Sequence, residues 1–285
     1  MAGGLASRFG RLKQIEPVGE NQQFIIDYSI FDAVKTGFNK VIFIIHPRNY
    51  TLFKTSIEKR IKGRIDVDYA FQIYDEKIRT KPWGTAHALY SARKHITQNF
   101  ALINADDFYG RDSFQKAKSV LENIQQNTGS LITFKLGNTI YDSQKYKRGL
   151  CVLEENKLIQ INECEVQKKE CYFCCTNLID SQTTIMPKDT PTSMNFWCFH
   201  KSILPLFEEE FEKEFEISKQ TNPQAGEIFL PSIITNLISQ NKITINTSQS
   251  NSKCFGMTYK DDLIYVKKDI KNLTTKGFYT KKLWN

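Results

Sequence analysis

The chain has 285 residues, 40% of them hydrophobic and 25% charged, a balance that suits a globular protein with a sizeable core in one large or two unequal domains. No apolar run approaches the length of a membrane-spanning helix and no secretory leader pattern is found, so we expect a cytoplasmic protein without a membrane partner. The net charge of +8 comes from dispersed basic residues without a nucleic-acid-binding motif, which favours a small polyanionic substrate over nucleic acid.

The N-terminal stretch from Met1 to Arg8 is rich in small residues, and a second cation follows at Lys13. Glycines let backbone N–H groups come close to a ligand, and consecutive loop N–H groups can form a concave anion site. Arg8 and Lys13 would neutralise the charge that develops on a triphosphate as a P–O bond breaks. Taken alone, the stretch is equally compatible with a flexible terminus.

Helical periodicity alternates with short apolar runs through the first half of the chain. Residues 24–37 repeat apolar side chains at helical spacing, and Gly37 marks the end of that helix. The following predicted elements are a strand at 41–45, a helix at 50–62, a strand at 67–72, a helix at 85–95 and a strand at 100–104. This alternation predicts an α/β fold with a doubly wound, mostly parallel sheet, which binds its ligand beyond the carboxyl ends of the strands.

Two aspartates, Asp106 and Asp107, follow the strand predicted at 100–104. A carboxylate just past a strand end can hold Mg²⁺ against triphosphate oxygens, and we assign that role to Asp106. Asp107 is a candidate nucleotide contact, and the alternative is that it caps the helix that follows.

Gln72 on one side and Gly84 with Thr85 on the other flank the expected base pocket. A glutamine amide offers a donor and an acceptor to a pyrimidine edge, and a glycine lets the base lie against the backbone. A solvent-facing Gln72 is the alternative. His87 falls on the helix after the glycine, so we interpret it as a packing residue rather than a catalytic base.

Short, partly alternating strands dominate the second half of the chain, at 131–136, 149–153, 158–161 and 194–199. Such strands suit a mixed-sheet lobe that closes over a second substrate. We therefore divide the chain into a nucleotide-binding core at 1–130 and an acceptor-binding lobe with C-terminal helices at 131–285, within one continuous catalytic domain. Phe207, Phe211 and Phe215 recur at helical spacing among glutamates, which predicts an amphipathic helix.

Seven cysteines without a secretory context favour reduced thiols over disulfides. The cluster of Cys171, Cys174 and Cys175, with Cys164 upstream, suggests a zinc site as an alternative, but a second pair at finger-like spacing is lacking. The Tyr-Phe insert between these cysteines is more typical of a strand.

Four stretches, taken in chain order, resemble the signature motifs of the sugar-phosphate nucleotidyltransferases, the family of the NDP-sugar pyrophosphorylases. The motifs are specific as a set, and the resemblance covers nearly the whole chain. The stretches are Gly4-x-x-Ser7-Arg8-(x)4-Lys13, Trp83-Gly-Thr-Ala-His-Ala88, Asn104-Ala-Asp-Asp-Phe-Tyr-Gly110 and Thr192-Ser-Met-Asn-Phe-Trp197.

The resemblance implies a Rossmann-like fold of the nucleotide-diphospho-sugar transferase type and a Mg²⁺-dependent uridylyltransferase-like or thymidylyltransferase-like reaction. It implies catalytic roles for Arg8 and Lys13 and a metal-binding role for Asp106. The implied nucleotide-binding residues are Gly3, Gly4, Leu5, Ala6, Ser7, Gln72, Gly84, Thr85 and Asp107. The implied sugar-binding residues are Gly149, Glu163 and Asn195.

The sequence departs from this family at four places. The strand that precedes the signature loop in the family is missing, so either the true start lies upstream or the sheet has lost a central strand. Ala6 replaces a loop glycine, and Cys164 stands where better-known members carry a lysine for the sugar phosphate. Gly256 stands near the expected place of a second metal-binding aspartate. Asp261 or Asp262 would substitute only after a local shift, and such a pair more often begins a helix.

We expect a nucleotidyltransferase that joins a nucleoside triphosphate to a sugar 1-phosphate and releases pyrophosphate. One alternative is a phosphocholine-type cytidylyltransferase, whose aromatic and acidic cage would be built from Trp197, Tyr172 and Phe173 with Glu163 or Glu165. The other is a degenerate, non-catalytic module that binds a nucleotide or an NDP-sugar. The base, the acceptor and the oligomeric state stay open.

Overall fold

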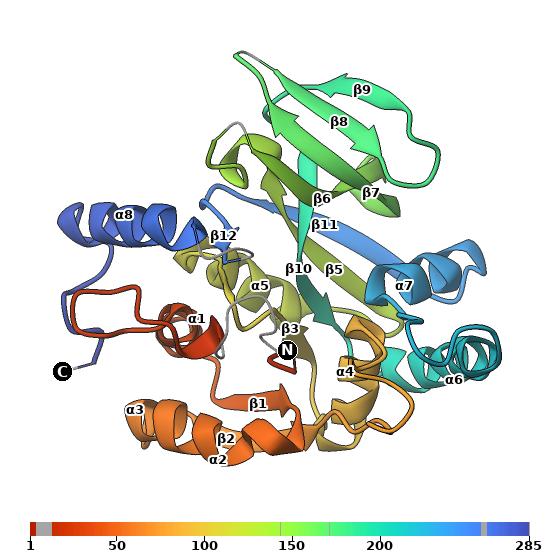
Figure 1. Cartoon of the computed structure of the whole chain (residues 1–285), viewed down its shortest axis with the longest axis horizontal. Helices are drawn as coiled ribbons and strands as arrows, with labels where there is room; N and C mark the ends of the chain where they lie inside the picture. The colour runs from red at the N-terminus through yellow and green to blue at the C-terminus, as the bar shows by residue number, and fades with distance from the viewer. Residues whose placement is uncertain (4–12, 143, 171, 258–260, 285) are drawn as a thin grey trace.

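Two sheets and a short two-stranded ribbon organise the computed structural model, which describes residues 1–3, 13–142, 144–170, 172–257 and 261–284 (Figure 1). The strands are β1 Lys40–Ile45, β2 Asp66–Phe71, β3 Phe100–Leu102, β4 Asp107–Phe108, β5 Thr128–Lys135, β6 Lys145–Glu154, β7 Lys157–Lys168, β8 Phe173–Asn177, β9 Thr183–Met186, β10 Pro191–Phe199, β11 Thr244–Ser250 and β12 Phe255–Gly256. The α-helices are α1 Ile25–Lys35, α2 Tyr50–Phe53, α3 Lys59–Ile61, α4 Thr85–Ala92, α5 Arg111–Asn123, α6 Ile203–Thr221, α7 Leu230–Ser239 and α8 Asp262–Thr275.

The smaller sheet contains β1 and β2 in parallel register, with α1 before β1 and α2 and α3 between the two strands. The alternation of helix and strand predicted for this part of the chain is therefore confirmed. Gly37 adopts φ +93°, a conformation that glycine tolerates at a helix end. The helix predicted at 50–62 is divided by a π-helical turn at Lys54–Glu58. It still buries one apolar face, Phe53, Ile57 and Ile61.

The larger sheet has eight strands in the order β11-β5-β10-β6-β7-β8-β9, with β3 pairing to β10. Its pairings are antiparallel apart from the parallel pair β11 and β5. The prediction of a mostly parallel, doubly wound sheet is therefore wrong for this sheet, which is mixed. The sheet is mixed because β10, a strand from the second half of the chain, runs antiparallel to its partners β3, β5 and β6. The proposed division at 130/131 falls inside β5 and stays a prediction.

Three helices, α4, α6 and α7, pack together against this sheet and share its largest apolar core. The predicted aromatic stripe lies on α6, where Phe207 and Phe211 are buried and Phe215 packs against the core. The acidic face of α6 is mostly exposed, although Glu210 is buried and accepts a hydrogen bond from Gln240 at 3.3 Å. This stripe therefore has the packing role that its spacing predicts.

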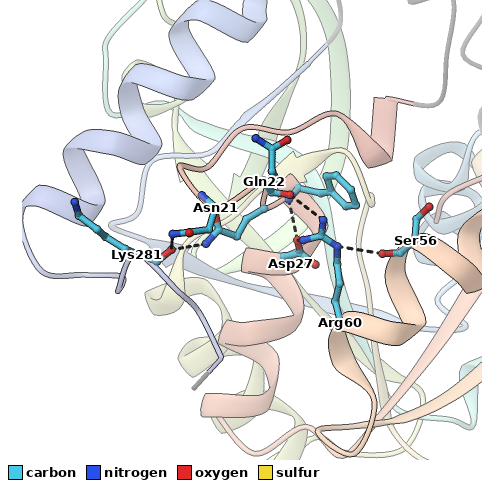
Figure 2. A network of polar contacts seen from close by, with 8 residues as sticks. Asn21, Gln22, Asp27, Ser56, Arg60 and Lys281 are labelled. Atoms are coloured by element: carbon cyan, nitrogen blue, oxygen red, sulfur yellow. Dashed lines mark hydrogen bonds and ion pairs between the residues drawn. The ribbon is translucent and has the colours of Figure 1, made fainter.

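The segment before α1 is fastened to two distant parts of the chain (Figure 2). Arg60 of α3 donates to the Asp27 carboxylate, to the Gln22 carbonyl and to the Ser56 carbonyl, at 3.0, 3.0 and 3.1 Å. The carbonyl of Lys281, near the C-terminus, accepts from Asn21 at 2.8 Å. Together these bonds hold the loop that connects the predicted phosphate-binding stretch to α1.

The C-terminal tail packs against α1 through a buried carboxylate. Asp32 accepts a hydrogen bond from the Tyr279 hydroxyl at 2.5 Å and pairs with Arg111 of α5 at 3.0 Å. Burial nevertheless raises the pKa of Asp32 to about 6. Arg111 also donates to the Phe278 carbonyl at 3.2 Å, so the tail, α1 and α5 form one connected unit.

The backbone of Met1 and Ala2 lies between β1 and β3. Ala2 N donates to the Ile44 carbonyl at 2.7 Å, and Ala105 N donates to the Met1 carbonyl at 2.9 Å. The Met1 amino group donates to the Ile103 carbonyl at 2.6 Å. Two strands that do not pair with each other are thus joined at their carboxyl ends by these first residues.

Candidate active site

Gln72 brings two of the predicted nucleotide-binding segments together. Its side chain is buried, with Nε2 donating to the Gly84 carbonyl at 3.0 Å. Its Oε1 lies close to Gly3. A Cβ added at Gly3 would lie less than 3.0 Å from this oxygen, which is closer than real Cβ atoms approach other atoms. The solvent-facing alternative for Gln72 is therefore wrong, and a side chain at position 3 would have to displace the Gln72 amide.

Gly84 and Thr85 are held by the segment that leads into α7. Gly84 adopts φ +92°, and a Cβ there would lie 2.5 Å from the Ile228 carbonyl oxygen, so both conformation and space require glycine. The Thr85 hydroxyl accepts a hydrogen bond from Leu230 N at 2.9 Å. In this structure the Thr85 side chain therefore anchors the first turn of α7.

His87 is buried behind this segment. Its ring stacks on Phe211 at a centroid distance of 6.1 Å, and Nδ1 accepts from Trp83 N at 3.4 Å. Burial, with a smaller contribution from nearby Arg79, lowers the pKa of His87 to about 4. A neutral, enclosed imidazole agrees with the packing interpretation.

Asp106 and Asp107 lie beyond β3, where the fold brings strand ends together. Asp107 Oδ2 accepts from the Asn104 side chain at 2.8 Å and lies 3.5 Å from the Tyr109 hydroxyl. Helix α5 begins at Arg111 with Gly110 at its N-cap, so the helix-cap alternative for Asp107 is wrong.

The Met1 amino group lies within electrostatic reach of both aspartates. Burial lowers its pKa to about 6, and the charges of Asp106 and Asp107 oppose that shift. The backbone agrees with this, since Ala105 N, directly before the two aspartates, donates to the Met1 carbonyl at 2.9 Å. Among the described residues there is no group of three or more His, Cys, Asp and Glu side chains that could hold a metal ion. Two carboxylates nevertheless match the way Mg²⁺ is usually held, through one or two carboxylates, water and substrate phosphates.

Gly256 faces Asp107 across the short ribbon of β4 and β12. A Cβ at position 256 would overlap Asp107 Oδ1, so the Asp107 carboxylate fills the space that a side chain at 256 would need. Asp261 and Asp262 lie at the N-terminus of α8, as N-cap and first residue, and Asp262 is buried. The helix-start interpretation of this pair is confirmed. Asp107 therefore supplies a carboxylate at the place where the sequence lacks an aspartate at 256.

The predicted sugar-binding residues gather on three adjacent strands of the larger sheet. Ser193 of β10 is paired with Gly149 of β6, which is paired with Glu163 of β7. A Cβ at 149 would lie 3.4 Å from Glu163 Oε1 and 2.6 Å from the Ile161 side chain, so the glycine makes room for Ile161 beside the carboxylate. Burial raises the pKa of Glu163, and Lys147 and Arg148 oppose the shift.

Asn195 lies at an irregularity in β10 and adopts φ +58°. Its Oδ1 accepts from the Trp197 indole at 3.3 Å. The preceding residue, Met194, accepts from the Tyr109 hydroxyl at 2.9 Å, and the same hydroxyl lies beside Asp107. Tyr109 therefore connects the Asp107 carboxylate to the strand that carries Asn195.

The replacement of a lysine by Cys164 has a structural consequence. Cys164 is buried in a separate apolar cluster and burial raises its pKa, so its thiol lies on the opposite face of β7 from Glu163. Lys147 pairs with Glu165 in the register of β6 and β7, two residues before Gly149, and so lies on the same face as Glu163. Lys147 is not among the sugar-binding residues predicted from the sequence, although its spacing of two residues from Gly149 is typical of one face of a strand.

The aromatic cage expected for a phosphocholine enzyme does not form from the residues considered. Trp197 and Phe173 are buried in two different apolar clusters, and Trp197 stacks on Phe199. Tyr172 is 41% exposed. The cysteines of the described residues are free thiols.

Several predicted site residues lie outside the described residues, namely Gly4, Leu5, Ala6, Ser7 and Arg8. Lys13 begins a short 3₁₀ turn, Lys13–Ile15, and its side chain is also outside the description. Their assigned roles stay predictions. No described helix is long and apolar enough to cross a membrane.

Gln72 follows β2 and Asp106 follows β3, and in α/β proteins ligands bind beyond the carboxyl ends of the strands. The fold is shared with solved structures of other proteins, among them the following two. One, from T. maritima, is an inositol-1-phosphate CTP transferase with 11% identity and a TM-score of 0.62, covering 95% of this chain and 94% of that one. The other, from Bacillus anthracis, is described as a glucose-1-phosphate thymidylyltransferase in complex with a sucrose, with 14% identity, a TM-score of 0.64 and coverage of 95% and 93%.

The family model described as "Nucleotidyl transferase" matches residues 1–163, and the chain belongs to this family. The resemblance inferred from the four motifs is thereby confirmed. A search of curated proteins gave no match to this chain.

Proposed function

We propose that this protein transfers a nucleotidyl group from a nucleoside triphosphate to a sugar 1-phosphate and releases pyrophosphate. The observation that carries the proposal is the connection made by Tyr109, whose hydroxyl contacts both Asp107 and the backbone of β10 at Met194. It joins a carboxylate pair suited to a triphosphate to a strand surface suited to a sugar. The family match and the two structural neighbours support a reaction of this class.

The nucleotide would lie over Gly3 and Gly84, against the buried amide of Gln72. At both glycines the space that a Cβ would need is filled by protein atoms, Gln72 Oε1 at Gly3 and the Ile228 backbone at Gly84, so the absence of side chains lets these segments pack closely around the proposed pocket. The contact from Gln72 Nε2 to the Gly84 carbonyl fixes the amide before any ligand binds, which reduces the entropy lost on binding.

Asp106 and Asp107 would hold the Mg²⁺ that a triphosphate brings. Their oxygen ligands fit this ion, and the absence of a side chain at Gly256 leaves room for the Asp107 carboxylate. Bound Mg²⁺ would neutralise negative charge on the phosphates.

The chain's own residues would act by position and charge. An oxygen of the acceptor phosphate attacks the α-phosphorus in line, the bond from the α-phosphorus to the bridging oxygen breaks, and pyrophosphate leaves with the bonding electron pair. Arg8 and Lys13 would stabilise the transferring and leaving groups. A phosphate monoester dianion is already a nucleophile, so no protein nucleophile or base is required.

The acceptor would lie on the surface formed by Gly149, Glu163 and Asn195. The Glu163 carboxylate can accept hydrogen bonds from two sugar hydroxyls. Lys147, exposed and on the same face, would contribute the positive charge for the acceptor phosphate that Cys164 does not provide. This assignment is specific to the register of β6 and β7 in this chain.

A panel of nucleoside triphosphates combined with sugar 1-phosphates, inositol phosphate and phosphocholine, followed by pyrophosphate release, tests the proposal. We expect turnover with a sugar 1-phosphate. Turnover with phosphocholine alone would refute the assigned acceptor. Calorimetric binding of a nucleotide without pyrophosphate from any pair would identify a non-catalytic module instead.

A further inference from the structure

A cavity of about 280 Å³ lies between the loop before α1 and helix α8, and we call it the α8 pocket. The loop contributes residues 17–20 and Gln22, α1 contributes Tyr28, and the C-terminal tail contributes Lys281. The residues of α8 that line it are Lys267, Ile270, Lys271 and Thr274. None of these residues belongs to the proposed nucleotide, metal or acceptor surfaces, so the α8 pocket has a lining of its own.

Hydrogen bonds hold the loop and the tail together at this pocket. Val18 N and Gly19 N both donate to the Gln23 carbonyl, at 2.7 and 3.1 Å. The Lys281 carbonyl accepts from the Asn21 side chain at 2.8 Å (Figure 2) and from the Gln23 side chain at 2.5 Å. These bonds fix part of the lining before any ligand binds, which reduces the entropy lost on binding.

The Tyr28 hydroxyl is a buried donor that faces the α8 pocket. The Tyr28 side chain is 2% exposed and packs edge-on against Phe108 and Tyr279, at centroid distances of 6.1 and 5.1 Å. Its hydroxyl lies beside Gly19 in the lining, where an added Cβ would be 2.5 Å from the oxygen.

No described residue forms a hydrogen bond with the Tyr28 hydroxyl. Burial raises the pKa of Tyr28, with smaller contributions from the charges of Asp27 and Glu20, so the hydroxyl keeps its proton. Side chains buried to this extent usually have their polar atoms hydrogen-bonded. An acceptor inside the α8 pocket would satisfy this donor.

Positive charge dominates the polar part of the lining. Lys267 and Lys271 lie one helical turn apart on α8, and neither forms an ion pair with a described carboxylate. Lys281 pairs with Glu20 at 3.4 Å, so this pair adds little net charge. The two unpaired ammonium groups therefore favour an anionic acceptor for the Tyr28 hydroxyl.

The remaining lining is partly apolar, through Pro17, Val18 and Ile270, of which Val18 and Ile270 belong to a buried core cluster. The volume of about 280 Å³ is that of several water molecules, each about 30 Å³ in the liquid, so a phosphate ion alone would leave much of the pocket unfilled.

We propose that the α8 pocket is a binding site for a small organic phosphate, whose phosphoryl group contacts the two unpaired lysines of α8 and the Tyr28 hydroxyl. The carbon body of the ligand lies against the apolar part of the lining. This combination of apolar wall and a few placed polar groups is usual for small-molecule sites. The site goes beyond the proposed function, because none of its contacts takes part in the transfer.

The test titrates ribose 5-phosphate and inorganic phosphate into the full chain and follows backbone amide chemical shifts. The amides of Gly19, Ile270 and Thr274 report on the α8 pocket. The amides of Gly149 and Glu163 report on the acceptor surface, where a sugar phosphate has a second place to bind. The two sets of shifts separate binding at the two places.

Two variants remove the proposed contacts, Tyr28→Phe and the double variant Lys267→Gln/Lys271→Gln. The matched control is Lys268→Gln/Lys276→Gln, which removes the same charge at exposed lysines of α8 and its C-cap that do not line the pocket. Melting temperatures of all variants are measured on the same preparations.

We expect ribose 5-phosphate to bind the α8 pocket with a Kd below about 1 mM and at least about tenfold more tightly than inorganic phosphate. Tyr28→Phe should weaken this binding about tenfold without lowering the melting temperature, since the lost hydroxyl has no partner among the described residues. Lys267→Gln/Lys271→Gln should weaken it at least about fivefold, and the control variant less than about twofold.

Equal weakening by the control variant would overturn the proposal, because it would indicate general attraction to a basic surface. Shifts confined to Gly149 and Glu163 would overturn it too, as would equal affinities for the two phosphates. If Tyr28→Phe does not fold, the two double lysine variants carry the comparison. Turnover is not a readout here, so failure of this site and failure of the proposed transfer are distinguishable.

Discussion

Replacing Gly256 by alanine tests the role of the Asp107 carboxylate. The added Cβ would fall inside 3.0 Å of Asp107 Oδ1, so the carboxylate must rotate away. Rotation breaks the 2.8 Å bond from the Asn104 amide and the contact with Tyr109. A hydrogen bond to a charged group contributes about 1.5–3 kcal/mol, so we expect a loss of that order in the free energy of unfolding. In a chain of this size this corresponds to a fall of roughly 3–10 °C in melting temperature.

The same rotation would remove one of the two carboxylates proposed for Mg²⁺, so pyrophosphate release should fall about 100-fold or more. The double variant Gly256→Ala/Asp107→Gly separates the two effects. It removes the overlap and should recover part of the lost stability, while activity stays low. Thermal unfolding and pyrophosphate release are measured on the same preparations. A Gly256→Ala protein within about 1 °C and threefold of the parent would refute the assigned contact and the role of Asp107.

Asp106→Asn should leave the melting temperature nearly unchanged, since the change is nearly isosteric, and should reduce turnover more than about tenfold. A rate above a tenth of the parent's rate, which is a loss under about 1.4 kcal/mol, would contradict metal-assisted transfer. Gln72→Ala should raise the KM for the nucleoside triphosphate and destabilise the fold, because it leaves a cavity beside Gly3 and removes a buried bond. Lys147→Ala, on β6, should raise the KM for the sugar 1-phosphate at least about fivefold with the triphosphate KM unchanged. Lys157→Ala, at an exposed lysine of β7, is the matched control. Asp32 has a folded-state pKa of about 6, above its ordinary value of 3.8. Between these values the folded protein keeps the Asp32 carboxyl protonated more than the unfolded chain does, so the contribution of Asp32 to stability falls as the pH rises from about 4 to 6. Relative to Asp32→Asn, the parent should therefore lose on the order of 3 kcal/mol over that interval in chemical unfolding, and parallel curves would contradict the raised pKa.

The sequence by itself determined the elements whose signal is local. The helix at 24–37, the strand at 41–45 and the stripe of α6 follow from apolar spacing, which depends only on which face of an element is buried. The family was likewise evident from four short motifs, because each motif keeps its residue types at a fixed spacing.

Tertiary structure alone decided how the strands are paired and which site residues meet. Strand β10 reaches β3, β5 and β6 from a distant part of the chain, and no periodicity along the sequence records such a pairing or its direction. The fit of Asp107 into the space beside Gly256 joins residues 149 positions apart (256 minus 107), and it exists only because β4 and β12 form a ribbon. Gln72 was ambiguous in sequence for the same reason, since its burial depends on Gly3 and Gly84, which the fold brings to it from two other segments.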